Sequence, residues 1–238
     1  MYFNDYSFDG ISMKLTDSTQ DSFAVGSIVG ELQGYKLNNL ITRDGDVMVD
    51  VGGHCGVVSI YFAKKYPNLK IFTYEPYKRN YLALLDNLKA NGVHNVTPFN
   101  LAISSDGRKV RMQQHSSNTG GSTFCHKNQD LHLAEASKEK AGYDTAHQFD
   151  YAKSITLDEA LDNNNVTSCK ILKVDCEGAE HEIFDTYSFK HEIENFIGEF
   201  HINDLLTESG YSYAKLDGQL ESHGIKPQNI AYCNMANY

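Results

Sequence analysis

Apolar residues in the first half of the chain alternate between short β-branched runs and longer segments with helical spacing. The run at 47–52 ends in glycines, which is typical of a buried strand that meets a tight turn. A broad apolar face then predicts a helix over 55–66, which a proline ends. By the same criteria we expect a strand over 70–75, a helix over 77–90 and a strand over 96–103.

The second half of the chain repeats this alternation. A Thr-Leu-Asp-Glu capping box at 156–159, whose hydroxyl and carboxylate satisfy each other's exposed amides, predicts a short helix to about Leu161. Strands are expected over 169–175 and 196–202, with a helix over 179–187 between them. Strands that alternate with helices predict an α/β fold, in which a mostly parallel sheet carries helices on both faces.

Two segments stand outside this alternation. Residues 1–40 predict an N-terminal cap with a small strand or helix, and the main domain then covers 41–238. Residues 105–153 are longer than an ordinary connection. We interpret them as an insertion over the ligand face, with a peripheral solvated excursion as the alternative. Within the insertion, 109–114 predict an extra strand and 130–147 have a helix-forming composition.

Charge and composition narrow the classes of partner. The 238 residues carry 21 Lys and Arg against 31 Asp and Glu, a net charge of −10. So acidic a chain is a poor binder of nucleic acid or anionic lipid. Its sequence holds no apolar run near the roughly 20 residues that span a bilayer, and its polar N-terminus does not resemble a signal peptide. Five cysteines without CxxC spacing indicate reduced thiols, so we expect a cytoplasmic protein.

The turn after the first predicted strand is the first candidate site. Asp50 ends the strand, and Gly52, Gly53, His54 and Gly56 follow. Glycines at such a turn let the backbone approach a ligand closely, and the next helix offers amides at its N-terminus. Turns of this kind also occur where a helix only packs on a strand, so the turn by itself leaves both interpretations open.

A carboxylate on the next strand indicates a nucleoside ligand. Glu75, followed by Pro76, lies 23 residues after Gly52. That spacing suits an acid that accepts both hydroxyl groups of an adenosine ribose. The turn does not read GxGxxG, and the sequence has no GK[ST] motif. Asp50 would repel a pyrophosphate and attract an ammonium group, which favours S-adenosylmethionine (SAM) over NAD or FAD.

A later strand ends in an acidic segment. Residues 172–180 read Leu-Lys-Val-Asp-Cys-Glu-Gly-Ala-Glu, so Asp175 and Glu177 directly follow the strand. This segment resembles the FkbM family of class I SAM-dependent methyltransferases. The resemblance covers about residues 40–203, and the further segments that carry it are 49–56, 74–76, 100–104, 156–158 and 199–201.

The resemblance implies a Rossmann-like class I methyltransferase fold, with a mostly parallel seven-stranded sheet, helices on both faces and an antiparallel last strand. It implies O-methylation of a hydroxyl on a sugar, glycan or secondary metabolite. It also implies roles for single residues: Asp50, Gly52 and Gly56 in the SAM loop, Glu75 at the ribose, Asn100 and Ala102 beside adenine, and Asp175 and Glu177 as the acidic pair.

One position departs from the family pattern. His54 stands where the family commonly has asparagine. A histidine there can still donate to the cofactor carboxylate, but its charge would depend on pH. We therefore expect SAM to bind as in the family, but the detailed geometry of the glycine loop around His54 to differ.

The chemistry of methyl transfer points to candidate catalytic residues. Transfer to a hydroxyl needs in-line alignment and benefits from a general base, for which Asp175, Glu177 and His201 are the candidates. His201 has the best-suited ordinary pKa but is equally a buried core histidine. Glu177 is equally a carboxylate that stabilises a helix start, and Glu180 is expected to hold the first helical turn. Asp175 and Glu199 together offer oxygen ligands for Mg²⁺ as a metal-dependent alternative.

Three functions stay open on the sequence. An O-methyltransferase that acts on a small-molecule or glycan acceptor is the first. A class I methyltransferase directed at nitrogen or at a protein side chain is the second. A non-catalytic nucleotide-binding domain or an NAD-linked oxidoreductase is the third, and Asp50 argues against the oxidoreductase. A homo-oligomer is compatible with each of them, and the sequence identifies neither the acceptor nor the oligomeric state.

Overall fold

The computed structural model describes residues 2–16, 22–37, 39–113, 149–225 and 227–234. A central sheet runs through the described part of the chain in the order β14-β13-β11-β3-β4-β5, and every neighbouring pair in it is parallel. Its strands are β3 (Val47–Val51), β4 (Lys70–Tyr74), β5 (Val96–Phe99), β11 (Ile171–Val174), β13 (Phe196–Ile202) and β14 (Pro227–Asn234).

This sheet confirms the α/β prediction and corrects two of its details. The sheet has six strands among the described residues, where the resemblance implied seven. β14 pairs with β13 in parallel, where an antiparallel last strand was expected. The reason lies in the connection, because helix α8 (Tyr213–Ser222) lies between the two strands in the chain. A helical crossover returns the chain to the end of the sheet where the preceding strand began, so the next strand runs parallel.

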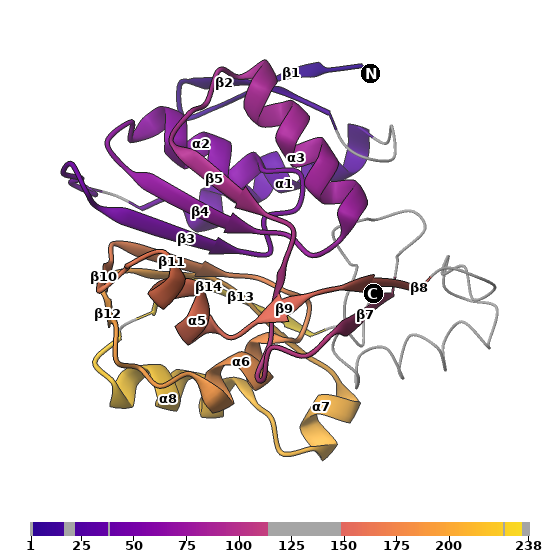
Figure 1. The fold of residues 1–238 in the computed structure, drawn as a ribbon, viewed down its shortest axis with the longest axis vertical. Coiled ribbons are helices and arrows are strands. Elements are labelled where there is room, and N and C mark those ends of the chain that lie inside the picture. Colours follow the sequence, from indigo (N-terminus) through magenta and orange to yellow (C-terminus); the bar gives the residue numbers. More distant parts are fainter. Residues whose placement is uncertain (1, 17–21, 38, 114–148, 226, 235–238) are drawn as a thin grey trace.

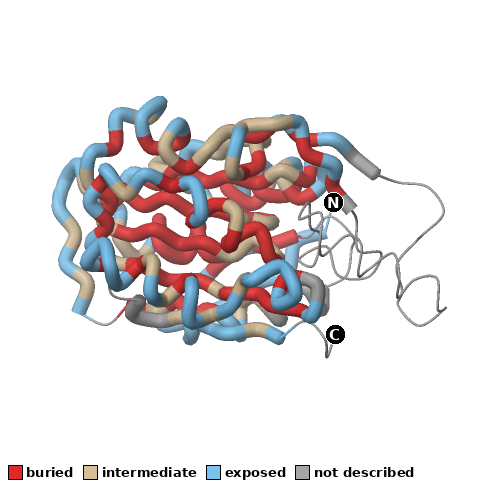
Figure 2. Tube along the Cα trace, turned by 90° about the horizontal axis from the view of Figure 1, so that it is seen from below, coloured by how far each residue is buried: buried red, intermediate tan, exposed pale blue. Residues whose placement is uncertain are grey.

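Helices cover both faces of the sheet (Figure 1). One face carries α1 (Ser22–Tyr35), α2 (Val57–Lys65) and α3 (Lys78–Ala90). The other carries α5 (Leu157–Asn163), α6 (Glu180–Thr186) and α8, with the short α7 (Asp204–Glu208) beyond them. Buried residues fill the interior of the described trace, and exposed residues lie on its outside (Figure 2). Every described helix is too short or too polar to cross a membrane.

The inner strands β3, β4, β11 and β13 each supply residues to two apolar cores. Met48 and Ile71 belong to the core beneath α1, α2 and α3, whereas their neighbours Val49 and Phe72 belong to the core on the other face. This follows from the strand geometry, since successive side chains point to opposite faces. It also explains why the strand sequences read as continuous apolar runs, because both faces of the sheet are covered.

Most of the predicted elements are present, with two strands divided. The stretch predicted at 96–103 forms β5 and then β6 (Ala102–Ile103), which pairs with β9 (Ser154–Ile155) instead of the central sheet. The stretch at 169–175 forms β10 (Ser168–Cys169) and β11, and β10 pairs with β12 (Glu192–Ile193). The capping box is confirmed. The Thr156 hydroxyl accepts from the Glu159 amide at 3.1 Å, and the Glu159 carboxylate accepts from the Thr156 amide at 2.8 Å.

The N-terminal segment and the insertion each contribute a strand pair. β1 (Asn4–Phe8) and β2 (Ile11–Leu15) form an antiparallel hairpin that packs with α1 against α2 and α3. β7 (Val110–Gln113) confirms the extra strand and pairs with β8 (Phe149–Ala152) beyond the carboxyl ends of β3 and β4 (Figure 1). The segment 130–147, whose composition is helix-forming, lies outside the described residues. The division into a cap, a main domain and a lid stays a prediction.

One buried side chain, that of Asn87 on α3, joins the hairpin to the rest of the fold. Its amide oxygen accepts from the Thr16 amide at 2.7 Å, and its amide nitrogen donates to the Thr16 carbonyl at 2.7 Å and to the Cys55 carbonyl at 2.8 Å. One turn later, the partly buried Asn91 makes the same pair of contacts with the backbone of Lys14, through hydrogen bonds that are exposed to solvent. The hydrogen bonds of the two asparagines to the hairpin segment therefore differ in burial.

We predict that Asn87→Ala lowers the free energy of unfolding by about 2–4 kcal/mol, because it leaves buried backbone groups without partners. Asn91→Ala should cost less than about 1 kcal/mol, since water can replace exposed hydrogen bonds. Urea unfolding followed by circular dichroism measures both. Equal losses in the two variants would show that burial of Asn87 does not stabilise the docked hairpin.

Candidate active site

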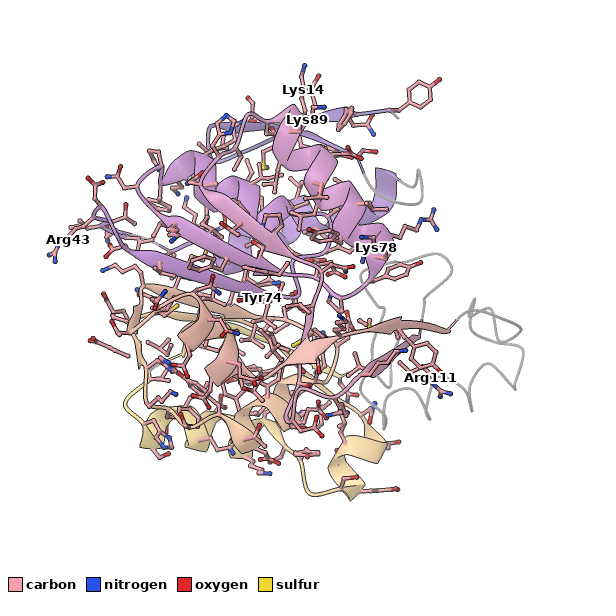
Figure 3. All side chains as sticks on the ribbon, in the orientation of Figure 1. Lys14, Arg43, Tyr74, Lys78, Lys89 and Arg111 are labelled. Carbon is pink, nitrogen blue, oxygen red and sulfur yellow. The ribbon has the colours of Figure 1, made fainter. Side chains whose placement is uncertain are left out.

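The sequence-predicted site residues gather at the carboxyl ends of the central strands. Arg43, ahead of β3, and Lys78, after β4, lie at opposite ends of the sheet (Figure 3). The candidate residues lie at the Lys78 end, because they occupy the second half of β3 and β13 or come directly after β3, β4 and β11. Parallel strands end at the same edge of a sheet, so segments far apart in the sequence meet there.

The glycines of the first turn are required by the protein's own atoms. A Cβ on Gly52, whose φ is +83°, would lie 1.8 Å from the Asp175 carbonyl oxygen. A Cβ on Gly53 would lie 2.2 Å from Thr73 Cγ2. The amides of Gly52 and Gly53 both donate to the Tyr74 carbonyl. The turn thus packs closely on its neighbours, as in the simple packing interpretation, and this packing places Asp175 directly beside Gly52.

Asp50 has a cationic partner within the protein, which the sequence reasoning missed. Its carboxylate is fully buried, accepts from the Ser59 hydroxyl at 2.6 Å, and lies 3.3 Å from Lys173 Nζ. Lys173 also donates to the Gly52 carbonyl at 2.7 Å and lies 3.4 Å from Asp175 Oδ2. Burial opposes the charge of Lys173, but the attraction of Asp50 and Asp175 outweighs it and raises the lysine pKa.

This ion pair changes the charge argument made from the sequence. Lys173 neutralises Asp50, so Asp50 does not by itself discriminate between an ammonium group and a pyrophosphate. The one signal for Lys173 was a lysine at the centre of an otherwise apolar strand. Asp50 therefore stabilises the glycine turn indirectly, because it binds the lysine that donates to Gly52. The carboxylates that lie toward solvent belong to β11, β13 and the segments after them.

Glu75 lies at the end of β4 with both carboxylate oxygens hydrogen-bonded to the backbone. Oε2 accepts from the His54 amide at 2.8 Å and Oε1 from the Tyr77 amide at 2.8 Å. The side chain is 5% exposed, and this burial raises its pKa to about 7, although the two amides oppose the shift. Glu75 thereby connects the glycine turn to the start of α3.

The remaining residues of the predicted cofactor segments support this arrangement. Burial and the nearby Lys173 lower the pKa of His54 to about 4, so its imidazole is neutral near pH 7. The Asn100 amide nitrogen donates to the carbonyls of Glu75 and Pro76, at 2.9 Å each, and fixes the segment after β4. Ala102 is buried in β6, so its side chain packs in the core.

Three partly exposed carboxylates cluster beyond β11 and β13. The side chains of Asp175, Glu177 and Glu199 are 24%, 25% and 19% exposed. Burial would raise the pKa of Asp175, but the attraction of Lys173 outweighs it, and the pKa is lowered. Burial raises the pKa of Glu177 to about 7. The backbone of Glu177 adopts φ +56°, a conformation that is uncommon outside glycine and is found at functional turns.

His201 lies beneath these carboxylates and is only 4% exposed. Its Nδ1 lies 3.1 Å from Glu180 Oε1, and its Nε2 lies 3.8 Å from Glu177 Oε2 and 3.7 Å from Glu199 Oε2. Burial would lower the pKa of His201, but Glu177 and Glu180 outweigh it and raise the pKa well above its ordinary value. A protonated imidazole does not fit the role of general base that was considered for His201.

Glu180 has the structural role that was expected of it. Its carboxylate is fully buried and accepts from the amides of Cys176 and Gly178, both at 2.8 Å. These bonds hold the loop between β11 and α6, and Glu177 lies in that loop. Helix α6 begins at Glu180, so Glu177 precedes the helix and the helix-start interpretation does not describe its position.

Tyr35 at the end of α1 completes the cluster, and no sequence pattern pointed to it. Its hydroxyl lies 2.9 Å from Asp175 Oδ2 and 3.1 Å from Glu199 Oε1. Cys233 of β14 donates to the other oxygen of Glu199 at 3.3 Å. Both residues come from the two ends of the chain, where the family resemblance noted above does not reach.

Potential metal ligands fall into two sets among the described residues. One set is Asp175, Glu177 and His201, and the other is Glu199, His201 and Cys233, with the ligand atoms of each within 4.8 Å of one another. Asp175 and Glu199, the pair considered for Mg²⁺, do not share a set, and Tyr35 lies between them. Each set includes His201 and one includes a thiol, which a hard, oxygen-seeking ion does not favour. The geometry gives Mg²⁺ no support.

Comparison with known proteins adds a family match. The model of the methyltransferase FkbM domain matches residues 50–224. Methyltransferase 1 of Beauveria bassiana (strain ARSEF 2860) is 23% identical over 194 residues, which cover 76% of this chain and 73% of that protein. Methyltransferase sdnD of Sordaria araneosa is 26% identical over 172 residues, which cover 66% of this chain and 65% of that protein.

A solved structure is similar in part. Precorrin-6y C5,15-methyltransferase from Geobacter metallireducens GS-15 aligns with a TM-score of 0.42 and 19% identity, covering 77% of this chain and 65% of that one.

The raised pKa of Glu75 makes a prediction about pH. A carboxyl whose pKa is 4.5 unfolded and about 7 folded binds its proton more tightly in the folded state. The protein is therefore most stabilised by this group below pH 4.5, and that stabilisation is lost as the pH rises to about 7. Glu75→Gln removes this titration, so its unfolding free energy should fall less over that interval than that of the wild type.

Urea unfolding at several pH values in this interval measures the difference. Only the change with pH is compared, because the glutamine amide also places an N–H against a backbone donor and lowers stability at every pH. An equal fall in both proteins would mean that burial does not raise the pKa of Glu75.

Proposed function

The chain belongs to the FkbM methyltransferase family, and we propose that it transfers a methyl group from SAM to a hydroxyl group of a small-molecule or glycan acceptor. The observation that carries the proposal is the cluster of partly exposed carboxylates over buried cations, directly beside the glycine turn. The family supports methyl transfer. The charges and positions of the cluster support the cofactor and the acceptor class.

The charge of the cluster suits SAM. Its carboxylates outnumber its two cations, Lys173 and His201, and those cations are buried while Asp175, Glu177 and Glu199 lie toward solvent. A ligand that approaches this edge of the sheet meets mainly negative charge. SAM carries a sulfonium and an ammonium group against one carboxylate, so its net charge complements that of the cluster.

Glu75 suits the ribose of the same cofactor. Each of its oxygens accepts one backbone hydrogen bond, and a carboxylate oxygen has room for a second donor. The turn that contains Gly52 and Gly53 joins Glu75 to Asp175, so the ribose acid and the acidic cluster are fixed relative to each other. Such a rigid frame reduces the cost of aligning the cofactor.

Glu177 is the best-placed general base. It lies toward solvent, and its pKa of about 7 matches a proton acceptor that works near neutral pH. Protonated His201 lies behind it and stabilises the carboxylate. Asp175 is held at Oδ2 by Lys173 and Tyr35, which suits a residue that fixes the cofactor's positive charge. SAM supplies the methyl group, and Glu177 takes the proton that the acceptor hydroxyl loses.

The cofactor assignment predicts that S-adenosylhomocysteine (SAH) binds in the micromolar range and that NAD does not bind. Isothermal titration calorimetry of the purified chain, with and without Mg²⁺, tests both. We expect the same SAH affinity in either buffer, because Tyr35 lies between the two carboxylates considered for the ion. A folded sample that binds neither SAH nor NAD would refute the proposal and favour a non-catalytic domain.

The base assignment predicts a selective loss. Glu177→Gln should slow methyl transfer by at least about 100-fold while SAH binding is retained. The assay measures SAH released with an acceptor found by screening sugars and polyols. Glu194→Gln is the matched control, since Glu194 pairs with Lys170 ahead of β11 and β13, at the other end of the same strands. An N-directed enzyme would tolerate Glu177→Gln, because its acceptor needs alignment more than a base.

A further inference from the structure

Tyr35 stands apart from the other site residues because it comes from the N-terminal helix. Tyr35 is 3% exposed, and its hydroxyl contacts carboxylates of two adjacent strands, Asp175 directly after β11 and Glu199 within β13. The family match begins at residue 50, so the family does not assign a role to α1. The contact nevertheless reaches Asp175, one of the residues on which the proposed function depends.

We propose that Tyr35 is a positioning residue of the methyl-transfer site, which uses its single hydroxyl hydrogen to hold Asp175 and Glu199 in place for a cationic cofactor. The inference rests on the proposed function, because it assigns Asp175 to the positive charge of SAM. It makes α1 part of the active site.

The Tyr35 hydroxyl has fewer hydrogen atoms than acceptors. A tyrosine hydroxyl has one hydrogen to donate, yet it lies within hydrogen-bond distance of two carboxylates. Burial, followed by the charges of Asp175 and Glu199, raises the pKa of Tyr35 far above its ordinary value, so the hydroxyl keeps its hydrogen. The hydroxyl therefore lies between the negative charges of Asp175 and Glu199, and its one hydrogen is shared between the two carboxylates.

Two donors hold the same oxygen of Asp175. Lys173 Nζ and the Tyr35 hydroxyl both approach Oδ2, at 3.4 and 2.9 Å. The lysine lies beneath the site and attracts the carboxylate inward. The tyrosine hydroxyl fixes the same oxygen with a directional hydrogen bond and leaves Oδ1 to a ligand. Without the hydroxyl, we expect the carboxylate to turn toward Lys173 and to compensate less of the cofactor's charge.

The relative affinities of SAM and SAH distinguish a positioning role of Tyr35 from simple packing. SAM and SAH differ by one methyl group and one positive charge, so the ratio of their affinities reports how well the site compensates that charge. Loss of packing around Tyr35 would weaken both ligands together. Loss of the hydrogen bond should weaken the binding of SAM more than that of SAH. The bond holds the charged Asp175, and only SAM carries the sulfonium charge that Asp175 is proposed to compensate.

The experiment compares Tyr35→Phe with a matched control. Tyr61→Phe removes another phenol hydroxyl from the same apolar core, one that donates to Asp9 of the β1–β2 turn at 3.2 Å. Calorimetry gives the dissociation constants of SAM and SAH for each variant. We expect the preference for SAM over SAH to fall about ten-fold in Tyr35→Phe, the scale of one charge-assisted hydrogen bond, and to stay at the wild-type value in Tyr61→Phe.

A second variant tests whether the bridge reaches Glu199. Glu199→Gln removes one of the two like charges, and its amide can donate to the Tyr35 oxygen. The effect of Tyr35→Phe on the SAM-to-SAH ratio should therefore be smaller in the Glu199→Gln background than in the wild type. Strictly additive effects would overturn the bridge. This comparison also serves if Tyr35→Phe alone folds poorly, because the double variant lacks the repulsion between the two carboxylates.

The outcomes distinguish the inference from the proposed function. If the wild type binds neither SAM nor SAH, the proposed function fails. If the wild type binds both and Tyr35→Phe keeps the wild-type ratio, the proposed function stands and the role of Tyr35 is refuted. If both affinities fall equally, Tyr35 is a packing residue only, and the inference is likewise overturned.

Discussion

The ammonium group of Lys173 lies buried between the carboxylates of Asp50 and Asp175, 3.3 and 3.4 Å away. Uncompensated charges of one sign are costly in the interior, so the charged forms of Asp50 and Asp175 depend on this lysine. The same group donates to the Gly52 carbonyl and so fixes the turn between β3 and α2. Removing the lysine would leave the buried carboxylate of Asp50 and the partly exposed carboxylate of Asp175 without their cation, and the Gly52 carbonyl without its donor.

Around this lysine the site is arranged in layers of charge. Cations lie at the base, since Lys173 and His201 are both buried, and carboxylates lie above them toward solvent. Glu180 holds His201 from one side and the amides of the loop before α6 from the other. Because the polar groups are held by the protein before any ligand arrives, little reorganisation is needed when charge changes during a reaction.

The local pattern of the sequence predicted the strands and helices well, because periodicity and end signals act over a few residues. The strand over 47–52 and the capping box at 156–159 are examples. The prediction failed where long-range pairing decides. Residues after Phe99 leave the central sheet to pair with β9, and β14 joins the sheet in parallel. Nor could the local pattern choose among Asp175, Glu177 and His201 as general base, because the pKa of His201 depends on Glu177 and Glu180, which approach it from another segment of the chain.

The sequence by itself determined which residue types end each strand: Asp50, Glu75, Asp175 and Glu177 follow apolar runs, and parallel strands must end at one edge. It thereby determined that these side chains meet. Tertiary structure alone decided what each of them does. Lys173 neutralises Asp50, burial raises the pKa of Glu75, and Tyr35 arrives from a helix 140 residues before Asp175. Charge and protonation depend on neighbours in space, and those neighbours come from segments that the local pattern does not connect.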